Sequence, residues 1–329
     1  MAGERAMSLR TSLSQRAQQY LAERRRLGFE LSDMQEALES FTDYADRLKR
    51  HGPITLEVMS AWARRDHIQS TDPRTWARRL KRLRPFTRWL RQFEPRTEVP
   101  DDTVFGPIGG RGTPHIYSEQ EIGQLLAAAA QLTPALRGTT YATLFGLLLC
   151  TGLRISEAVR LRNGDVDLNS GVLTIRRSKF GKSRHVPLHA SALERLRQYR
   201  HARDRWITPT EESAFFVGHR GRRCGQPLNR RSVDRVLSQF RRQLGWVNRG
   251  THHAPRVHDT RHTFIVRRLL AWQRQGVDID QAMLALSTYV GHARISNTYW
   301  YLTAVPELMA LAAKKFESKV APRTGGRHA

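Results

Sequence analysis

Apolar residues in the first 93 positions recur at helical spacing. One set follows steps of three and four residues, and therefore lies on a single helix face: Met34, Leu38, Phe41, Tyr44 and Leu48. His51-Gly52-Pro53 ends this pattern, and Thr55 precedes the next apolar set as a candidate N-cap. The spacing therefore predicts a helical N-terminal region.

A longer helix is predicted to begin at Asp72-Pro73. Its apolar positions again share one face: Trp76, Leu80, Leu83, Phe86, Leu90 and Phe93. Pro85 lies inside this stretch, and because proline has no backbone N–H to donate, we expect it to kink or split the helix. Residues 94–116 have no periodicity and are rich in proline and glycine, which is typical of a linker.

Helical spacing returns after the linker. Residues 117–130 predict a helix in which Ser118 is the N-cap and Glu121 completes a capping box. Residues 139–150 predict a second, strongly apolar helix. The second half of the chain therefore begins with two helices that have a core to share.

Two short strands follow, at residues 171–175 and 185–188, joined by a basic turn. From Ala192 onward the pattern is mainly helical, with a polar loop expected at residues 273–280. The fold class is therefore mainly α with a small β-hairpin or sheet. The predicted divisions are a domain at residues 1–93, a linker at 94–116, a second domain at 117–320 and a flexible tail at 321–329.

Composition excludes several classes of protein. Hydrophobic residues make up 40% of the 329 positions, enough for a packed core. The longest apolar run, residues 144–149, falls far short of the ~20 residues that cross a bilayer, and the N-terminus lacks the apolar segment of a signal peptide. Cys150 and Cys224 make neither a disulfide framework nor a zinc site. We therefore expect a cytoplasmic protein.

The net charge of +25 points to an anionic partner, either nucleic acid or a membrane surface. Of the 55 basic residues only 7 are lysine. The planar guanidinium of arginine matches two phosphate oxygens at once, which favours nucleic acid and an association with the nucleoid. The alternative is that a GC-rich genome encodes arginine often and that the charge is exposed surface.

The charge is unevenly distributed. Residues 1–60 hold nine basic and nine acidic side chains, whereas residues 61–93 hold ten basic side chains against two acidic ones. Trp62, Trp76 and Trp89 fall in this basic segment, so we expect one side of the N-terminal domain to face phosphates. The predicted DNA contacts are Arg78, Arg79, Lys81, Arg82, Lys182, Arg184, Arg230 and Arg231.

Two segments of the second domain carry candidate chemistry around basic residues. In TGLRISE, Arg154 follows the turn at the end of an apolar helix, where a buried charge is costly unless it meets an anion. The alternative is an internal pair between Arg154 and Glu157. In the turn between the strands, Lys179 projects an amine toward a groove, or else the turn is an exposed hairpin tip.

Two further segments hold histidines and a tyrosine. In HDTRH, His258 and Arg261 share a helix face and can reach one phosphate. His258 and His262 have the spacing of a metal pair, but the glutamate of H-E-x-x-H is absent. Gly291-His292 is followed nine residues later by Tyr301, within an aromatic run that otherwise reads as core packing.

In their order along the chain, these segments resemble the tyrosine recombinase (phage integrase) family. TGLRISE is similar to the family's first box, KFGKSRHVPL to its hairpin, and HDTRH to its second box. The ending TYWYLTAVPELM resembles integrases carried by mobile elements. The resemblance covers the whole second domain and implies a helical core-binding domain followed by a mixed α/β catalytic domain.

The resemblance implies a site-specific recombinase or integrase that uses neither metal nor ATP. Tyr301 is then the nucleophile that forms a 3′-phosphotyrosyl link, and Arg154 and Arg261 bind the phosphate oxygens. Lys179 protonates the departing 5′ oxygen. His258 and His292 hydrogen-bond the phosphate or move the tyrosine proton.

The resemblance also implies partners: double-stranded DNA at a recombination site, and a homotetramer on two such sites or a mixed assembly with related recombinases. Residues 306–319 are then the segment exchanged between protomers. No cofactor, metal or membrane is implied.

Three alternatives stay open. Tyr299 is a rival nucleophile, about 200° around the helix from Tyr301. A second alternative is a DNA-binding regulator or accessory protein that retains the recombinase fold but does not cleave DNA. The third reading is a metal-dependent nuclease built on His252, His253, His258 and His262.

Overall fold

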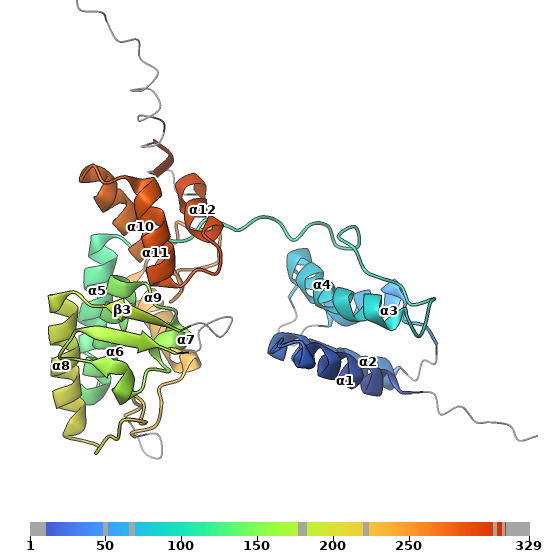
Figure 1. The fold of residues 1–329 in the computed structure, drawn as a ribbon, viewed down its shortest axis with the longest axis horizontal. Helices are drawn as coiled ribbons and strands as arrows, with labels where there is room; N and C mark the ends of the chain where they lie inside the picture. The colour runs from blue at the N-terminus through green and yellow to red at the C-terminus, as the bar shows by residue number, and fades with distance from the viewer. Residues whose placement is uncertain are drawn as a thin grey trace, which may run out of the picture. The chain divides into compact units, whose positions relative to one another are not determined.

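The computed structural model describes residues 11–48, 52–65, 70–176, 183–219, 224–304, 308–310 and 313. The chain divides into two compact units, Met1–Arg111 and Gly112–Ala329 (Figure 1). Lys179 and Lys182 lie outside the described residues. Among the helices that are described, each is too short or too polar to cross a lipid bilayer.

Unit 1 consists of helices in its described residues: α1 (Leu13–Arg26), α2 (Ser32–Arg47), α3 (Leu56–Arg64) and α4 (Pro73–Leu90). Thr55 caps α3 by accepting from the backbone N–H of Val58 at 3.4 Å, and Asp72 caps α4. Helix α4 packs against the other three and continues through Pro85, so the expected split does not occur. The fold class, mainly helical with a small sheet, is confirmed.

Trp62 and Trp89 belong to the core of unit 1 and Trp76 packs against it, so the phosphate-facing side that the sequence predicts would have to be formed by the basic residues. Trp62 and Trp89 are 2% and 6% exposed and pack among apolar side chains, because burying an indole removes a large apolar area from water. Arg79 lies over the Trp62 ring at 4.4 Å and donates to the carbonyl of Trp62, so it joins α4 to α3. The exposed basic face of α4 is formed by Arg74, Arg78, Lys81, Arg82 and Arg88.

Residues 94–116 form neither helix nor strand, but much of this segment packs on one unit or the other. On the unit 1 side, Arg84 donates to the carbonyl of Pro100 at 2.7 Å. On the unit 2 side, the carbonyl of Thr113 accepts from the N–H of Thr251 at 2.9 Å. The boundary between the units, at Arg111–Gly112, falls within the predicted linker.

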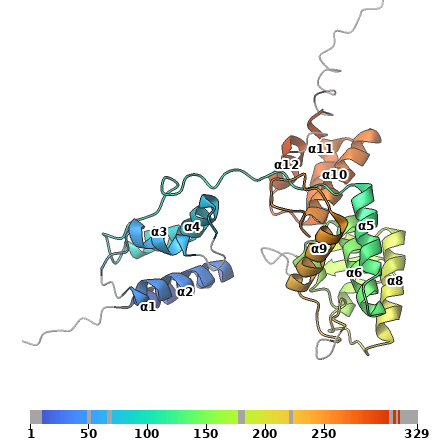
Figure 2. The same ribbon diagram turned by 180° about the vertical axis from the view of Figure 1, so that it is seen from behind.

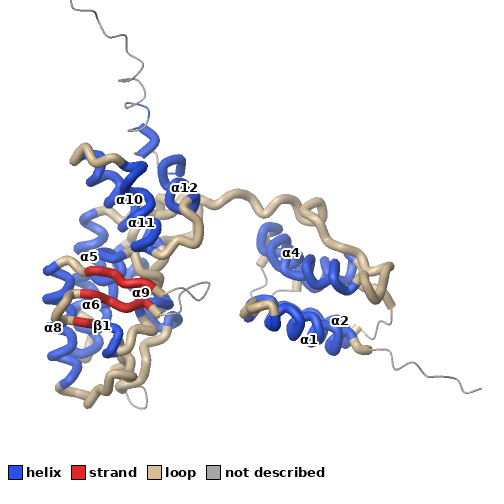
Figure 3. Tube along the Cα trace, viewed as in Figure 1, coloured by secondary structure: helices blue, strands red, loops and turns tan. Residues whose placement is uncertain are grey.

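Unit 2 holds a three-stranded antiparallel sheet, with helices beside it (Figure 3). The strands are β1 (Val166–Asp167), β2 (Val172–Ile175) and β3 (Arg184–Pro187), and Leu173 pairs with Val186. β1 was not predicted, because two residues carry no alternation to detect. The surrounding elements are α5 (Glu119–Ala130), α6 (Ala135–Thr151), α7 (Ile155–Ala158), the 3₁₀ turn η1 (Asn163–Asp165), α8 (Ala190–Asp204) and α9 (Arg230–Leu244).

Three C-terminal helices lie together at one end of unit 2 in both views (Figures 1 and 2): α10 (Asp259–Arg274), α11 (Ile279–Val290) and α12 (Ser296–Ala304). They share an apolar core of their own, and α10 also packs against α6. The polar loop expected at residues 273–280 is shorter than predicted, because α10 extends to Arg274 and α11 begins at Ile279. The N-cap Asp278 explains this early start, since its side chain accepts from the N–H of Asp280.

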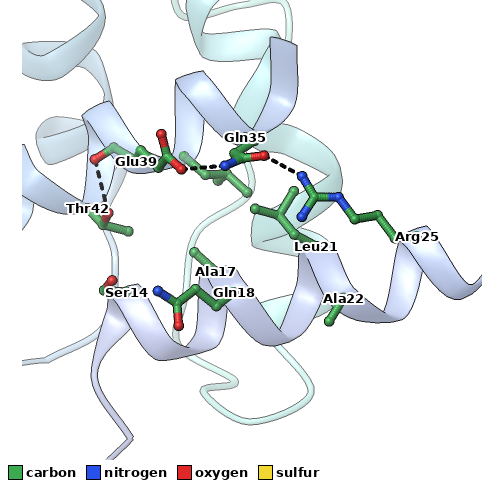
Figure 4. Close-up of a pocket in the computed structure, with 10 residues that line it drawn as sticks. Ser14, Ala17, Gln18, Leu21, Ala22, Arg25, Gln35, Glu39 and Thr42 are labelled. Atoms are coloured by element: carbon green, nitrogen blue, oxygen red, sulfur yellow. Dashed lines mark hydrogen bonds between the residues drawn. The ribbon is translucent and has the colours of Figure 1, made fainter. Parts of the chain in front are cut away.

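A shallow groove lies between α1 and α2 within unit 1 (Figure 4). Gln35 bridges its rim by accepting from Arg25 and donating to Glu39. None of the residues that line it is a predicted site residue.

Candidate active site

The turn between α6 and α7 positions Arg154. Helix α6 ends at Thr151 and is capped by Gly152, which has φ +64°, and a Cβ at Gly152 would lie 2.5 Å from the Phe264 ring of α10. Glycine is therefore needed for both the backbone conformation and the close approach of the two helices. The carbonyl of Gly152 accepts from Arg261 Nη1 at 2.7 Å, so one turn orients both arginines.

Glu157 joins two arginines from separate elements. Its Oε1 accepts from Arg154 Nη1 at 2.8 Å and from Arg184 Nη1 at 3.0 Å, and its Oε2 accepts from Arg184 Nη2 at 2.9 Å. The predicted internal pair of Arg154 with Glu157 therefore exists. It is compatible with anion binding, because the Arg154 side chain keeps 21% of its surface exposed whereas Glu157 keeps 5%.

Both arginines are also tied to the end of α11. Arg154 Nη2 donates to the carbonyl of Gly291 at 2.8 Å, and Arg184 Nε donates to the carbonyl of Tyr289 at 2.9 Å. Gly291 has φ +72°, and a Cβ there would lie 2.7 Å from Arg184 Nη1. The Gly-His pair therefore marks the place where the hairpin, α7 and α11 meet.

Burial alone would raise the pKa of the Glu157 carboxyl, but hydrogen bonds and positive charge from Arg184 and Arg154 hold that pKa below its ordinary value. The carboxylate is therefore charged at neutral pH. A charged, buried acceptor fixes the two guanidinium planes before any substrate arrives.

Arg261 is the most strongly perturbed arginine of the site. Its side chain is buried, and burial together with the nearby charge of Arg154 lowers its pKa to about 9. Among the residues that the structure describes, its Nη2 has no hydrogen-bond acceptor. An unsatisfied buried donor costs free energy unless a ligand supplies the acceptor, and an anionic oxygen would do so.

Tyr301 on α12 faces the same site. Its side chain is fully buried, and its hydroxyl lies 2.7 Å from Nδ1 of His262, which is 4% exposed. The proximity of Tyr301 to Arg261 acts on the pKa of that arginine. The phenol therefore lies within electrostatic range of Arg261, the arginine whose Nη2 has no acceptor among the described residues.

The rival Tyr299 points elsewhere on α12. Its hydroxyl donates to Asp280 Oδ1 on α11 at 3.4 Å. Burial and the negative charge of Asp280 raise the pKa of the Tyr299 phenol, which leaves less of it as phenolate at neutral pH. Of the two tyrosines, the structure brings Tyr301 to the arginines.

Of the two predicted histidines, His292 packs on Tyr301 and His258 packs on His262. His292 shares a hydrogen bond of 2.7 Å with Thr298 through Nδ1, and its ring stacks parallel to that of Tyr301 with centroids 6.4 Å apart. His258 is exposed at the N-cap of α10, and its ring lies 4.9 Å from that of His262. Arg154, Arg261, His258, His292 and Tyr301 are thus assembled at one place.

Other predicted site residues lie apart from this cluster or outside the described residues. Lys179 and Lys182 are in the undescribed part of the hairpin. Arg230 and Arg231 are exposed in the first turn of α9, where Arg230 pairs with Asp234 at 3.5 Å. In the described part of the chain, no three His, Cys, Asp or Glu side chains come close enough to hold a metal ion.

Sequence reasoning missed two contacts of the site. Arg184 was predicted to contact DNA, but its side chain is 10% exposed and bound to Glu157; a DNA contact by Arg184 stays a prediction. His262 was considered as a metal ligand, whereas it contacts the Tyr301 hydroxyl. The i, i+4 spacing of His258 and His262 was a usable signal, but the pairing with a tyrosine 39 residues away was not visible.

Comparison with known proteins identifies this arrangement. The model of the phage integrase family matches residues 116–307. The integrase/recombinase y4rB of Sinorhizobium fredii is 36% identical over 319 residues, covering 95% of this chain and 100% of that protein. The tyrosine recombinase XerC of Chlamydia caviae is 30% identical over 231 residues, covering 69% of this chain and 67% of XerC.

A solved structure shares the fold. The Tn1549 transposon integrase in complex with transposon right end DNA superposes with a TM-score of 0.63 at 17% identity, covering 93% of this chain and 99% of that one. The range that matches the family model, residues 116–307, includes the arginines, the histidines and the tyrosine described above. The chain therefore belongs to the phage integrase family and is a tyrosine-type site-specific recombinase.

Proposed function

We propose that this recombinase cleaves and rejoins DNA strands at a specific site through a 3′-phosphotyrosyl intermediate, and that it needs neither a metal ion nor ATP. The observation that carries the proposal is the buried Tyr301 within electrostatic range of Arg261, whose Nη2 has no hydrogen-bond acceptor among the described residues. A phosphodiester supplies the missing acceptor and the atom that the phenol attacks.

The residues divide the chemistry among them. Tyr301 Oη bonds to phosphorus, Arg154 and Arg261 bind the non-bridging oxygens, and His258 and His292 hydrogen-bond the pentavalent phosphate. Lys179 gives a proton to the departing 5′ oxygen, a role that rests on family resemblance. The phosphotyrosyl bond retains the energy of the broken bond, so a 5′-hydroxyl rejoins the strand without ATP.

Double-stranded DNA is the proposed partner. The relatives are named as integrases and recombinases, and the Tn1549 integrase was solved with transposon-end DNA. Unit 1 is proposed as the core-binding domain, because α4 presents an exposed row of basic side chains that suits a phosphate backbone. The assembly we propose is a homotetramer on two DNA sites, or a mixed assembly with related recombinases.

A nicked suicide substrate that carries the cognate site tests the proposal, because loss of a short strand traps the covalent intermediate. We expect the protein to become attached to the 3′ end, with EDTA present or absent. Tyr301→Phe should abolish the adduct while leaving DNA binding intact, and Tyr299→Phe is the matched control that keeps it. If Tyr301→Phe still formed an adduct, Tyr301 would not be the nucleophile. If the wild-type protein bound DNA but formed no adduct, a non-cleaving regulator would be supported instead.

The role of Lys179 has its own test. A substrate with sulfur in place of the bridging 5′ oxygen has a leaving group that needs no proton. We expect this substrate to restore cleavage by Lys179→Ala but not by Arg154→Ala. If both variants stay equally slow, Lys179 is not the general acid.

A further inference from the structure

We propose that His262 is the base that takes the proton from Tyr301 as the phenolic oxygen attacks phosphorus. This inference rests on the proposed function and assigns a role to a residue outside the expected catalytic set. It makes His262 a catalytic residue, because its Nδ1 touches a reacting atom.

The contact has the geometry that proton transfer requires. His262 Nδ1 and Tyr301 Oη are 2.7 Å apart, within the range of a general base and the proton it removes. Their side chains are 4% and 0% exposed, so bulk water does not compete for the phenol. A neutral imidazole that carries its hydrogen on Nε2 accepts at Nδ1, and this tautomer matches a donating phenol.

One neighbouring charge also bears on this tyrosine. The guanidinium of Arg261 lies close enough to Tyr301 for the two groups to interact electrostatically. A nearby positive charge stabilises negative charge on Oη as the O–H bond breaks. The base and this cation therefore favour the same step.

The other two histidines are placed for different work. His292 uses Nδ1 for Thr298, and its ring stacks on that of Tyr301. His258 is exposed at the start of α10, with its ring perpendicular to that of His262. His258 thus lies between the buried base and solvent, where it can pass on the proton that His262 gains.

The step balances within the proposed reaction. The O–H bond of Tyr301 breaks and its proton goes to His262 Nδ1, while the oxygen pair forms the bond to phosphorus. The bond from phosphorus to the 5′ oxygen breaks, and that oxygen takes its proton from Lys179. During rejoining the flow reverses, and the imidazolium of His262 returns a proton to the departing phenol.

Two variants separate basicity from packing. His262→Asn places an amide near the position of Nδ1 without a basic nitrogen, and His201→Asn changes an exposed histidine on α8 as the matched control. We expect His262→Asn to slow single-turnover adduct formation by about 10²- to 10⁴-fold, the usual worth of a general base, with DNA affinity unchanged. His201→Asn should match the wild type.

Replacing Tyr301 with 3,5-difluorotyrosine, a more acidic phenol, gives the readout that a structural role would not move. In His262→Asn it should restore most of the lost rate, because the phenol no longer needs a strong base. In Arg154→Ala it should restore none. A His262→Asn rate close to that of the wild type, or a defect that difluorotyrosine leaves unchanged, would overturn the assignment.

A third measurement uses the native histidine and does not depend on how a variant folds. On the 5′-sulfur substrate the leaving group needs no proton, so the solvent deuterium isotope effect on adduct formation reports the tyrosine proton. We expect this effect to fall toward one when difluorotyrosine replaces Tyr301, and an unchanged effect would contradict the proposal. Failure of the proposed function looks different, since the wild type would then form no adduct or Tyr301→Phe would still form one.

Discussion

Arginine is used in two opposite ways in this recombinase. On α4 of unit 1 the arginines form an exposed basic face, whereas Arg154, Arg184 and Arg261 of unit 2 are largely or fully withdrawn from water. Exposed arginines attract a polyanion through long-range electrostatic forces that salt weakens. Because these arginines stay in water, they cost the folded state little free energy. Buried arginines must be held by specific acceptors, and they gain in return a fixed geometry at one phosphate.

The buried set is itself divided. Arg154 and Arg184 are held by the carboxylate of Glu157, while Arg261 keeps an Nη2 that has no acceptor among the described residues. Of these three arginines, two are therefore bound to Glu157, whereas the third keeps one N–H donor group without an acceptor among the described residues. A high arginine content therefore indicates an anionic partner. The hydrogen-bond acceptors around each arginine indicate which of them is available for chemistry.

Among substitutions of the arginines and of Glu157, Arg261→Ala should have the largest effect on catalysis. The substitution removes the Nη2 group that is proposed to donate to a phosphate oxygen. Adduct formation on the suicide substrate should therefore fall on the order of 10³-fold. Arg261→Lys, which keeps a charge but loses the fork, should recover only a small part of this rate. Since one phosphate contact is lost among many, overall DNA affinity should change little. A near-normal rate for Arg261→Ala would contradict the role given to its unsatisfied Nη2.

Glu157→Gln should have the next largest effect on the rate of adduct formation, and it should also lower the stability of the fold. The carboxylate is buried between two guanidinium groups, so neutralising it leaves two buried cations and should lower the free energy of unfolding by about 3 kcal/mol, measured in urea. Cleavage should fall roughly 10²-fold, the effect of misplacing a charge clamp.

The pH dependence of stability checks the same residue. The pKa of Glu157 is lower in the folded protein than its ordinary value, so its contribution is present above that ordinary value and is lost as the pH falls through the lowered pKa. Glu157→Gln should therefore lose less stability in acid than the wild type does. Equal acid sensitivity in the two proteins would mean that Glu157 is not the charged link between the arginines.

How much of this was visible in the sequence depends on the range of each interaction. Helix starts such as Ser118 with Glu121 were predictable, because a capping box lies within four residues. The order of Arg154, His258, Arg261, His292 and Tyr301 was visible through a family pattern. The contact of His262 with Tyr301 was not, since it depends on how α10 and α12 pack.

The tryptophans of unit 1 also show that the sequence alone does not reveal which residues pack together. Trp62 and Trp89 occur beside many arginines in the sequence, and the sequence alone did not show which of these residues lie on the predicted phosphate-facing side. In the structure these tryptophans share a core with Tyr20, Phe41 and Phe86, whereas most of the basic residues of α4 are exposed. A stripe of aromatic residues at helical spacing is first of all core, and the basic residues between them belong to the opposite face.

Arg184→Lys should have a smaller effect on rate than Glu157→Gln. The lysine keeps one positive charge near Glu157 but cannot reproduce the two parallel bonds to the carboxylate or the bond to the carbonyl of Tyr289. Adduct formation should fall about tenfold, and the salt dependence of DNA binding should stay that of the wild type. Arg184→Gln, which removes the charge, would in addition make the salt slope shallower only if Arg184 contacts a phosphate, as the sequence predicted.

The smallest effect on chemistry should come from the exposed basic face. Replacing Arg78, Lys81 and Arg82 together by glutamine should leave cleavage at saturating DNA unchanged, and should make the slope of log affinity against log salt shallower by about 0.9 for each phosphate contact removed. Arg79→Gln is the matched control from the same helix. Because Arg79 stacks on Trp62 and donates to backbone carbonyls, it should lower the unfolding temperature and leave the slope alone. If Arg79→Gln changed the salt slope and the triple variant did not, α4 would meet DNA through a different face, and the contrast between exposed and anchored arginines in unit 1 would have to be redrawn.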